Sequence, residues 1–209
     1  MNLSHVFTNQ TWLLATSNKG KTLEIESILA PFNLQFENLQ QLRIGSPDEN
    51  GLTFIENALI KAQNGAKHSG LPTLADDSGL VVEDLDGAPG IYSSRYAHDE
   101  ATDAENIQHL IHQLQSRGLE RAKAHFHCTL VWCRHAKDPD PIIAQARWFG
   151  EVITNPNGQE GFGYDPVFWV PEQQCTAAQL SKVIKNKISH RGQALSILLN
   201  ELREVSKRG

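Results

Sequence analysis

Two adjacent aspartates, Asp76 and Asp77, close a short apolar run that begins at Leu74. Two carboxylates at the end of a buried strand repel each other unless positive charge lies beside them. A hard divalent cation such as Mg²⁺ or Mn²⁺ supplies that charge, because carboxylate oxygens are its preferred ligands. The same pattern is typical of a strand that ends in a turn with both acids in water. The dipeptide alone leaves both interpretations open.

A junction suited to anions lies near the start of the chain. The buried strand expected over 12–16 runs into Asn18, Lys19 and Lys21, and a helix follows that Pro31 ends. Free N–H groups at a helix start favour phosphate, and the two lysines add positive charge. The spacing of a P-loop is absent, and Asn18 as a simple helix cap remains the alternative.

A longer helix is expected after the polar loop that holds Glu49. Thr53 and Glu56 have the spacing of a capping box. Apolar residues then recur on one face, namely Ile55, Ala58, Leu59, Ala62 and Ala66. Lys61 lies one position beside that face, where it reaches either a phosphate or solvent. Glu49 by itself reads as a surface acid.

Two further segments could contact a nucleotide. In Gly161-Phe162-Gly163-Tyr164-Asp165-Pro166, the glycines allow close approach of the backbone, and Phe162 is either a stacking platform or a core residue. Near the C-terminus, Lys185, His190 and Arg191 place cations at a helix start, which a bound anion favours. His190 and Arg191 can also donate to a purine carbonyl oxygen, and a solvated basic patch is the alternative.

The elements that must position these residues are mixed strands and helices. Strands are expected over 12–16, 34–39, 74–77, 80–82, 122–132, 142–149 and 167–170, and helices through 23–29, 55–66, 107–114 and 194–202, with another starting at Thr176. Thr102 and Glu105 form a second capping box. This order predicts an α/β protein with a mixed sheet.

Composition excludes several classes of function. The 209 residues are 40% hydrophobic and 21% charged, which suits one globular domain with an adequate core. The net charge is −5 without a basic run, so a polynucleotide partner is not expected. No apolar run reaches the length of a membrane span, and no signal peptide is recognised. Three cysteines favour reduced thiols in a cytoplasmic protein.

Six motifs in order resemble the inosine/xanthosine triphosphate pyrophosphatase family, with a match from Trp12 to about Leu202. They are Thr16-Ser17-Asn18 with Lys21, Gly51-Leu52-Thr53-Phe54-Ile55-Glu56-Asn57-Ala58 with Lys61, Ala75-Asp76-Asp77-Ser78-Gly79, Gly87-Ala88-Pro89-Gly90, Gly161-Phe162-Gly163-Tyr164-Asp165-Pro166, and Ser189-His190-Arg191-Gly192. The resemblance implies Mg²⁺-dependent hydrolysis of ITP, dITP and XTP to the monophosphate and pyrophosphate, with one ion per subunit and Mn²⁺ as a substitute.

The same resemblance implies a fold and an assembly. The fold would be α/β, an elongated mixed β-sheet flanked by helices, with two lobes around a central active-site cleft. Residues 12–205 would form a single two-lobed domain after an N-terminal extension over residues 1–11. The protein would act as a homodimer on purine nucleoside triphosphates.

Roles also carry over by position, as implications of the resemblance. Asp77 would be the general base and a metal ligand together with Glu49, and Asp76 would support it. Substrate would contact the loop Thr16, Ser17, Asn18, Lys19, Gly20 and Lys21, as well as Lys61 and Ser78. Phe162 would stack on the base in a pocket shaped by Gly163, Tyr164 and Asp165, and Lys185, His190 and Arg191 would complete recognition.

Two other kinds of protein remain open on the same residues. One is a different enzyme on this scaffold, such as a nucleotide phosphatase or a pyrimidine-directed pyrophosphatase. The other is a nucleotide-binding module without catalysis. The segment Lys182-Val183-Ile184 also departs from the family pattern, where relatives often carry acids, so a local partner for Lys185 is not expected from it.

Overall fold

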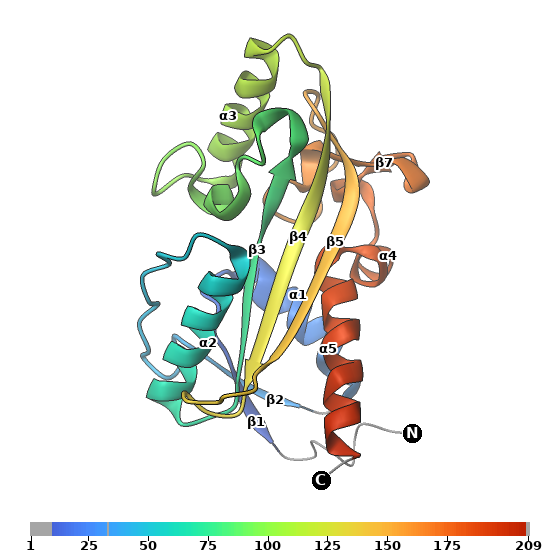
Figure 1. Ribbon diagram of the computed structural model, residues 1–209. Coiled ribbons are helices and arrows are strands. Elements are labelled where there is room, and N and C mark those ends of the chain that lie inside the picture. The colour runs from blue at the N-terminus through green and yellow to red at the C-terminus, as the bar shows by residue number, and fades with distance from the viewer. Residues whose placement is uncertain (1–9, 33, 208–209) are drawn as a thin grey trace. The chain divides into compact units, whose positions relative to one another are not determined.

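The computed structural model describes residues 10–32 and 34–207, and within them seven strands form one sheet (Figure 1). The strand order is β2-β1-β3-β4-β5-β6-β7. The strands are β1 (Thr11–Leu14), β2 (Gln35–Asn38), β3 (Thr73–Val82), β4 (Arg121–Cys133), β5 (Ile142–Ile153), β6 (Phe168–Val170) and β7 (Cys175–Thr176). β1 is parallel to β2 and β3, whereas β6 is antiparallel to β5 and β7. The expectation of an α/β protein with a mixed sheet is confirmed.

Helices occupy both ends of the chain and its middle. They are α1 (Lys19–Leu29), α2 (Phe54–Ser69), α3 (Asp103–Ser116), α4 (Lys182–Ile188) and α5 (His190–Ser206). The chain divides into two compact units. Unit 1 comprises the described parts of Met1–Asp77, Cys128–Ala146 and Arg191–Gly209, and unit 2 comprises Ser78–His127 and Arg147–His190.

In unit 1, successive strand residues alternate between two hydrophobic clusters, as the period of a strand requires. Leu14 and Leu74 belong to a cluster with residues of α1 and α5. Leu13 and Ala75 belong to a second cluster with the alanines of α2. Figure 1 shows α2 on one side of these strands and α1 with α5 on the other. The residues that follow Ala75 on β3 therefore face two different helical layers in turn.

Unit 2 has a core of its own. Leu80 and Val82 of β3 pack with Leu110 and Leu114 of α3 and with Phe168 of β6. The even-numbered residues of β4 in this unit, Ala122, Ala124 and Phe126, join the same cluster, as their period of two predicts. Thr102 and Glu105 form the expected capping box at the start of α3. Tyr164, Val167 and Phe168 belong to this core, so it anchors the end of the loop over residues 161–166, which carries candidate residues.

The separate strands expected over 74–77 and 80–82 are wrong, because both lie in the single strand β3. Asp76, Asp77, Ser78 and Gly79 have the composition of a turn. In the fold they continue the strand, since partners from other elements neutralise both buried acids. Tertiary pairing has overridden the local preference. The aspartates lie within a strand and not at its end.

Three smaller expectations also change. The helix expected from Thr176 is a 3₁₀ turn over Ala177–Gln179, and α4 begins later, at Lys182. Thr53 caps α2 as expected, but the Glu56 carboxylate accepts from the Leu52 N–H instead of closing a capping box. Residues 1–9 of the expected N-terminal extension lie outside the described residues, and Thr11 already belongs to β1.

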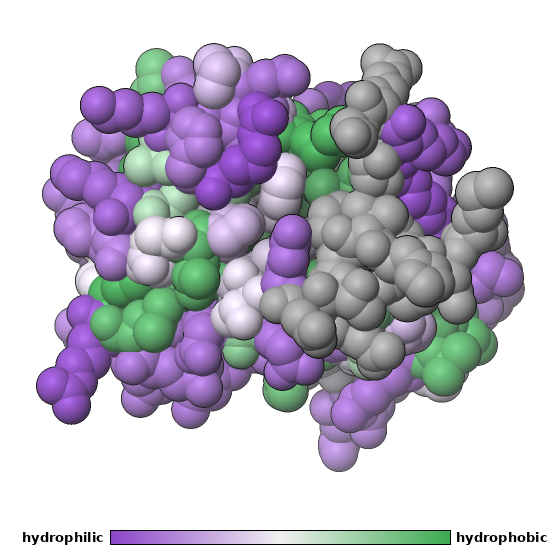
Figure 2. Space-filling model, turned by 90° about the horizontal axis from the view of Figure 1, so that it is seen from below, coloured by the Kyte–Doolittle hydropathy of each residue, from purple (hydrophilic) through white to green (hydrophobic). Residues whose placement is uncertain are grey.

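The surface in Figure 2 is mostly hydrophilic, and its apolar residues lie in separate groups. Among the described residues, no helix combines the length and the apolar character that crossing a bilayer requires.

The close contact of α2 with β1 and β3 yields a stability prediction. A Cβ atom at Gly65 would lie 2.8 Å from Leu13 Cδ2 and 2.9 Å from Thr73 Cγ2. Gly65→Ala should lower the free energy of unfolding by about 1–2 kcal/mol, because overpacking outweighs the gain of about 1 kcal/mol in helix propensity. Urea denaturation measures it, with Gln63→Ala on the exposed side of α2 as control. A Gly65→Ala variant as stable as the wild type would contradict this packing.

Candidate active site

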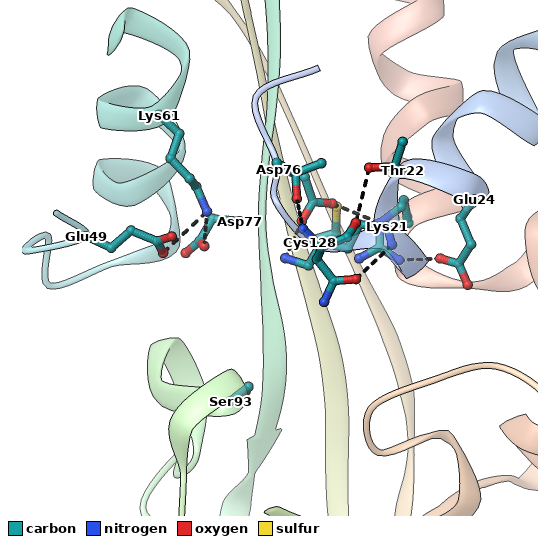
Figure 3. A network of polar contacts seen from close by, with 12 residues as sticks. Lys21, Thr22, Glu24, Glu49, Lys61, Asp76, Asp77, Ser93 and Cys128 are labelled. Carbon is teal, nitrogen blue, oxygen red and sulfur yellow. Dashed lines mark hydrogen bonds and ion pairs between the residues drawn. The ribbon is translucent and has the colours of Figure 1, made fainter. Parts of the chain in front are cut away.

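Asp76 and Asp77 point to opposite sides of β3 (Figure 3). Asp77 continues the face of Ala75, toward α2, and Asp76 continues the face of Leu74, toward α1 and α5. Both side chains are buried, so each needs its own compensating charge. The two neighbours in sequence thus have different surroundings.

The Asp77 carboxylate is paired with Lys61 and lies in one cluster with Glu49. Lys61 Nζ is 2.6 Å from Asp77 Oδ1 and 3.4 Å from Glu49 Oε2. Burial opposes the charge on Lys61, but the carboxylates of Asp77 and Glu49 outweigh it and raise the pKa of Lys61. Burial also raises the pKa of Asp77, and the attraction of Lys61 and Lys21 offsets this only in part. The lysine expected beside the apolar stripe is therefore buried and paired.

Asp76 lies in a denser network. Lys21 Nζ is 2.6 Å from its Oδ1, and Arg191 Nε donates to its Oδ2 at 2.9 Å. The Cys128 thiol donates to the same oxygen at 3.4 Å. Arg191 also forms an ion pair with Glu24 of α1. Asp76 therefore joins α1, β4 and α5 through buried polar contacts.

Arg191 is the most buried cation of the set, with 1% of its surface exposed. Burial opposes its charge, but Asp76 and Glu24 more than compensate and raise the pKa of the guanidinium. Its position at the start of α5 would be unfavourable for a cation without these acids. The ion pairs of Arg191 with Asp76 and Glu24 explain why this cation is tolerated at the start of α5.

The loop between β1 and α1 turns tightly into its helix. Thr16 Oγ1 accepts from the Asn18 N–H at 3.2 Å, and Asn18 Oδ1 accepts from the Lys21 N–H at 3.1 Å. Asn18 is thus the N-cap of α1, as the simpler interpretation predicted. Ser17 and Lys19 are exposed, so the start of α1 remains open to an anion from solvent.

The cluster around Asp77 fits a hard divalent cation. Asp77 Oδ2 is buried and has no hydrogen-bond partner among the described residues. Glu49 contributes a second carboxylate beside the same lysine. No group of three or more His, Cys, Asp or Glu side chains suited to a metal occurs in the described part of the chain. Mg²⁺ is commonly held by one or two carboxylates with phosphate oxygens and water, which matches two protein donors.

Unit 2 holds the second set of candidate residues, arranged around Asp165. Its Oδ2 accepts from the Phe162 N–H at 2.9 Å and from Lys185 Nζ at 2.5 Å. Lys185 Nζ lies 5.0 Å from the centre of the Phe162 ring. Gly161 has φ +81°, and a Cβ there would lie 2.0 Å from Asp165 Oδ2, so only glycine fits. Lys185 therefore has an acidic partner after all, but this partner, Asp165, comes from the loop and not from the helix α4 that carries Lys185.

The same loop is anchored at two more points. The Gly163 N–H donates to Asp103 Oδ2 at 2.6 Å, at the first residue of α3. The Tyr164 hydroxyl donates to the Ser93 carbonyl at 2.9 Å, and Tyr164 is part of the core of unit 2. Phe162 is only half-buried and lies outside that core cluster. Of the two interpretations of Phe162, the one as a core residue does not hold.

His190 begins α5 and belongs to unit 2. Its ring stacks on Phe126, with centroids 4.7 Å apart and an interplanar angle of 11°. The ring is buried, and it is also nearly parallel to the Trp148 ring, with centroids 6.4 Å apart. Ser78, the first residue of unit 2, is half-buried within β3.

The candidate residues therefore fall into two groups. Unit 1 holds Thr16, Ser17, Asn18, Lys19, Gly20, Lys21, Glu49, Lys61, Asp77 and Arg191, and unit 2 holds Ser78, Phe162, Gly163, Tyr164, Asp165, Lys185 and His190. Sequence reasoning missed Glu24 and Asp103. Glu24 pairs with Arg191, which lies 167 positions away, and no local spacing signals such a contact.

Comparisons with known proteins identify the family and the fold. A dITP/XTP pyrophosphatase of Escherichia coli O157:H7 is 50% identical over 194 residues, covering 93% of this chain and 98% of the relative. A Ham1 protein structure from Coxiella burnetii superposes with a TM-score of 0.86 and 44% identity, covering 93% of this chain and 99% of that one. The Staphylococcus aureus Ham1 protein gives a TM-score of 0.80 and 34% identity at 93% and 99% coverage.

The model of the Ham1 family matches residues 12–201, which include every candidate residue. With that match running from β1 into α5 and the fold shared by solved relatives, the chain belongs to the Ham1 family.

Proposed function

We propose that this protein hydrolyses deaminated purine nucleoside triphosphates, ITP, dITP and XTP, to the nucleoside monophosphate and pyrophosphate. The observation that carries the proposal is the buried Asp77 carboxylate beside Lys61 and Glu49, with one oxygen that has no partner among the described residues. Relatives about half identical over nearly their full length bear the name dITP/XTP pyrophosphatase. The proposed task is removal of these nucleotides before incorporation into DNA or RNA.

Unit 1 supplies the residues for the triphosphate in this proposal. Lys21 and Lys61 neutralise phosphate oxygens, and the N–H groups at the start of α1 donate hydrogen bonds to an anion near Asn18. Thr16, Ser17, Lys19 and Gly20 line the same loop. Arg191 contributes positive charge to the same site, and its ion pairs with Asp76 and Glu24 hold the guanidinium in place.

Asp77 and Glu49 would hold one Mg²⁺ ion, with Mn²⁺ as a substitute. Both are oxygen donors, and Asp77 Oδ2 is free of other hydrogen bonds among the described residues. When bound, the ion neutralises phosphate charge and makes water a better nucleophile near neutral pH.

Asp77 is also the proton acceptor. Water attacks the α-phosphorus, its proton passes to the carboxylate, and the bond from the α-phosphorus to the bridging oxygen breaks to release pyrophosphate. Burial raises the pKa of Asp77, which makes it a better base than a solvated aspartate. Lys61 keeps the carboxylate in place through the 2.6 Å contact.

Unit 2 supplies the residues for the base. Phe162 stacks on the purine, in a pocket shaped by Gly163, Tyr164 and Asp165. Lys185 and His190 donate to the 6-oxo group, and Ser78 contacts the substrate. Adenine carries an amino group at that position and would leave the donors unpaired, which penalises ATP.

We further propose that residues 12–205 act as one catalytic domain and that the protein works as a homodimer in the cytoplasm. The three cysteines Cys128, Cys133 and Cys175 are thiols and not disulfides, which suits a reducing compartment. A net charge of −5 argues against a polynucleotide substrate.

A panel of nucleotides tests the proposal. With Mg²⁺, purified protein should release pyrophosphate from ITP and XTP at least about 100-fold faster than from ATP, since buried donors reject a base that leaves them unpaired. Separate assays of pyrophosphate and orthophosphate identify the bond that breaks. Orthophosphate as the main product, a preference for pyrimidines, or tight ITP binding without turnover would overturn the proposal.

Asp77→Asn should reduce kcat by about 100-fold or more, because the amide can neither accept the proton nor serve as an anionic ligand. Circular dichroism should show that the variant remains folded. Asp48→Asn is the matched control, since Asp48 is exposed one residue before Glu49. Unchanged turnover in Asp77→Asn would remove this residue from the mechanism.

Asp76→Asn should act on stability. The substitution leaves Arg191 buried with Glu24 as its remaining anion, which costs about 3 kcal/mol or more of unfolding free energy. Urea unfolding followed by fluorescence measures this loss. An unchanged midpoint would show that the Asp76 network is not needed for the fold.

A further inference from the structure

The segment from Gly45 to Gly51 has no regular secondary structure, yet it carries Glu49. It connects β2 to α2 and runs alongside α2 in Figure 1. Among the described residues, none of residues 45–51 forms a backbone–backbone hydrogen bond, so the backbone of the segment does not fix the carboxylate. Its position must come from contacts with its neighbours. We refer to residues 45–51 as the Glu49 segment.

Three polar side chains of α2 contact the Glu49 segment. Asn64 Nδ2 donates to the Gly45 carbonyl at 3.1 Å. Lys61 Nζ lies 3.4 Å from Glu49 Oε2. Asn57 Oδ1 accepts from the Gly51 N–H at 2.9 Å. We call Asn57, Lys61 and Asn64 the polar stripe.

The spacing of the polar stripe sets the direction of the segment. Positions 57, 61 and 64 follow the i, i+4, i+7 pattern of one helix face. Their partners come in the reverse order, since positions 51, 49 and 45 meet them in turn. The segment therefore runs antiparallel to α2, and the two asparagines hold it on either side of the Glu49–Lys61 ion pair.

Asn57 is an unusual residue for its position. It is fully buried, directly before Ala58, the first of the alanines that pack α2 against the sheet, and its Nδ2 has no partner among the described residues. A buried amide with an unsatisfied donor is unfavourable, and alanine or leucine would suit the helix better. What Asn57 gains in return is the contact of its Oδ1 with Gly51.

Gly51 permits this contact. A Cβ at position 51 would lie 2.6 Å from Asn57 Oδ1 and 2.6 Å from Glu56 Cβ. At Gly45 a Cβ would meet no atom within 4 Å. Neither glycine has a positive φ, so the difference between them is one of space and not of backbone conformation.

We propose that Asn57 and Asn64 are positioning residues that hold the Glu49 carboxylate where it binds the cation with Asp77. This inference rests on the proposed function for the identity of the cation. Removing a side chain that holds a metal ligand in place typically weakens metal affinity by about 10- to 100-fold. The asparagines touch neither substrate nor cation and act through Glu49.

The two glycines supply a matched pair of variants. Gly51→Ala keeps every side chain of the site but pushes the backbone away from Asn57, whereas Gly45→Ala adds the same methyl group in open space. Asn57→Ala and Asn64→Ala remove the contacts from the helix, with Gln63→Ala on the exposed face as their control.

Two readouts do not depend on turnover. Hydrogen exchange of peptides covering residues 44–52 reports whether the segment is held, and Mn²⁺ titration followed by electron paramagnetic resonance reports cation affinity without substrate. Gly51→Ala and Asn57→Ala should exchange faster in this segment and bind Mn²⁺ about 10-fold more weakly. Asn64→Ala should show a smaller change of the same kind, and Gly45→Ala and Gln63→Ala should match the wild type.

Kinetics separates positioning from a general loss of structure. In the affected variants the Mg²⁺ concentration for half-maximal activity should rise about 10-fold, while kcat at saturating Mg²⁺ and KM for ITP stay near wild type. Equal Mn²⁺ affinity in Gly51→Ala and Gly45→Ala would overturn the inference, as would faster exchange without weaker binding. If Gly51→Ala does not fold, the hydrogen exchange and Mn²⁺ affinity of Asn64→Ala, which lies at the helix surface, test the inference instead.

The outcome for the proposed function is separate. A wild-type protein that releases no pyrophosphate, but whose variants still differ in exchange and Mn²⁺ affinity as described, would refute the function and support the positioning role. An active wild type with no difference among the variants would refute the positioning role alone.

Discussion

The period of two along β3 is the constraint on which unit 1 depends. Asp76 and Asp77 are consecutive, so their side chains must enter opposite helical layers, and both side chains are buried. A buried carboxylate without a partner would unfold the strand or remain protonated. Each acid therefore has a cation of its own, Lys61 from α2 for Asp77, and Lys21 and Arg191 for Asp76.

These pairings give the two acids different capacities. Asp76 has both oxygens engaged, by Lys21 on one and by Arg191 and Cys128 on the other. Asp77 has one oxygen engaged by Lys61 and one oxygen with no partner among the described residues. Only Asp77 retains an oxygen for a cation or a proton. The different roles proposed for the two acids follow from which helical layer each side chain enters.

Unit 2 solves a similar problem with another acid. Asp165 orders the glycine-rich loop through the Phe162 N–H and neutralises Lys185 with the same oxygen. Asp103 and Tyr164 tie the loop to α3 and to the core of the unit. An aromatic ring and a cation are thus held in place before any ligand binds, which lowers the ordering cost of binding.

The sequence predicted elements with strong periodicity and clear caps. The alternation from Ala122 to Trp132 gave β4, and Thr102 with Glu105 gave the start of α3. The prediction failed for β3. The composition of Asp76 to Gly79 favours a turn locally, but the cations that neutralise Asp76 and Asp77 come from residues distant in the sequence. Arg191 lies 115 residues from Asp76, and no periodicity reports such a contact.

The burial of Lys61 could not be predicted from the sequence either, because its partners are distant in the sequence. A lysine beside an apolar stripe usually extends into water, and only the approach of Asp77 and Glu49 makes its burial favourable. The six motifs led to the candidate residues, but their pairing into ion pairs required the fold.

The most direct test of the account is hydrolysis of ITP in water labelled with ¹⁸O, followed by mass spectrometry of both products. If water attacks the α-phosphorus, the label will be found in the phosphate of the nucleoside monophosphate, and the released pyrophosphate will be unlabelled. Label in the pyrophosphate would mean attack at the β-phosphorus and would contradict the assigned chemistry.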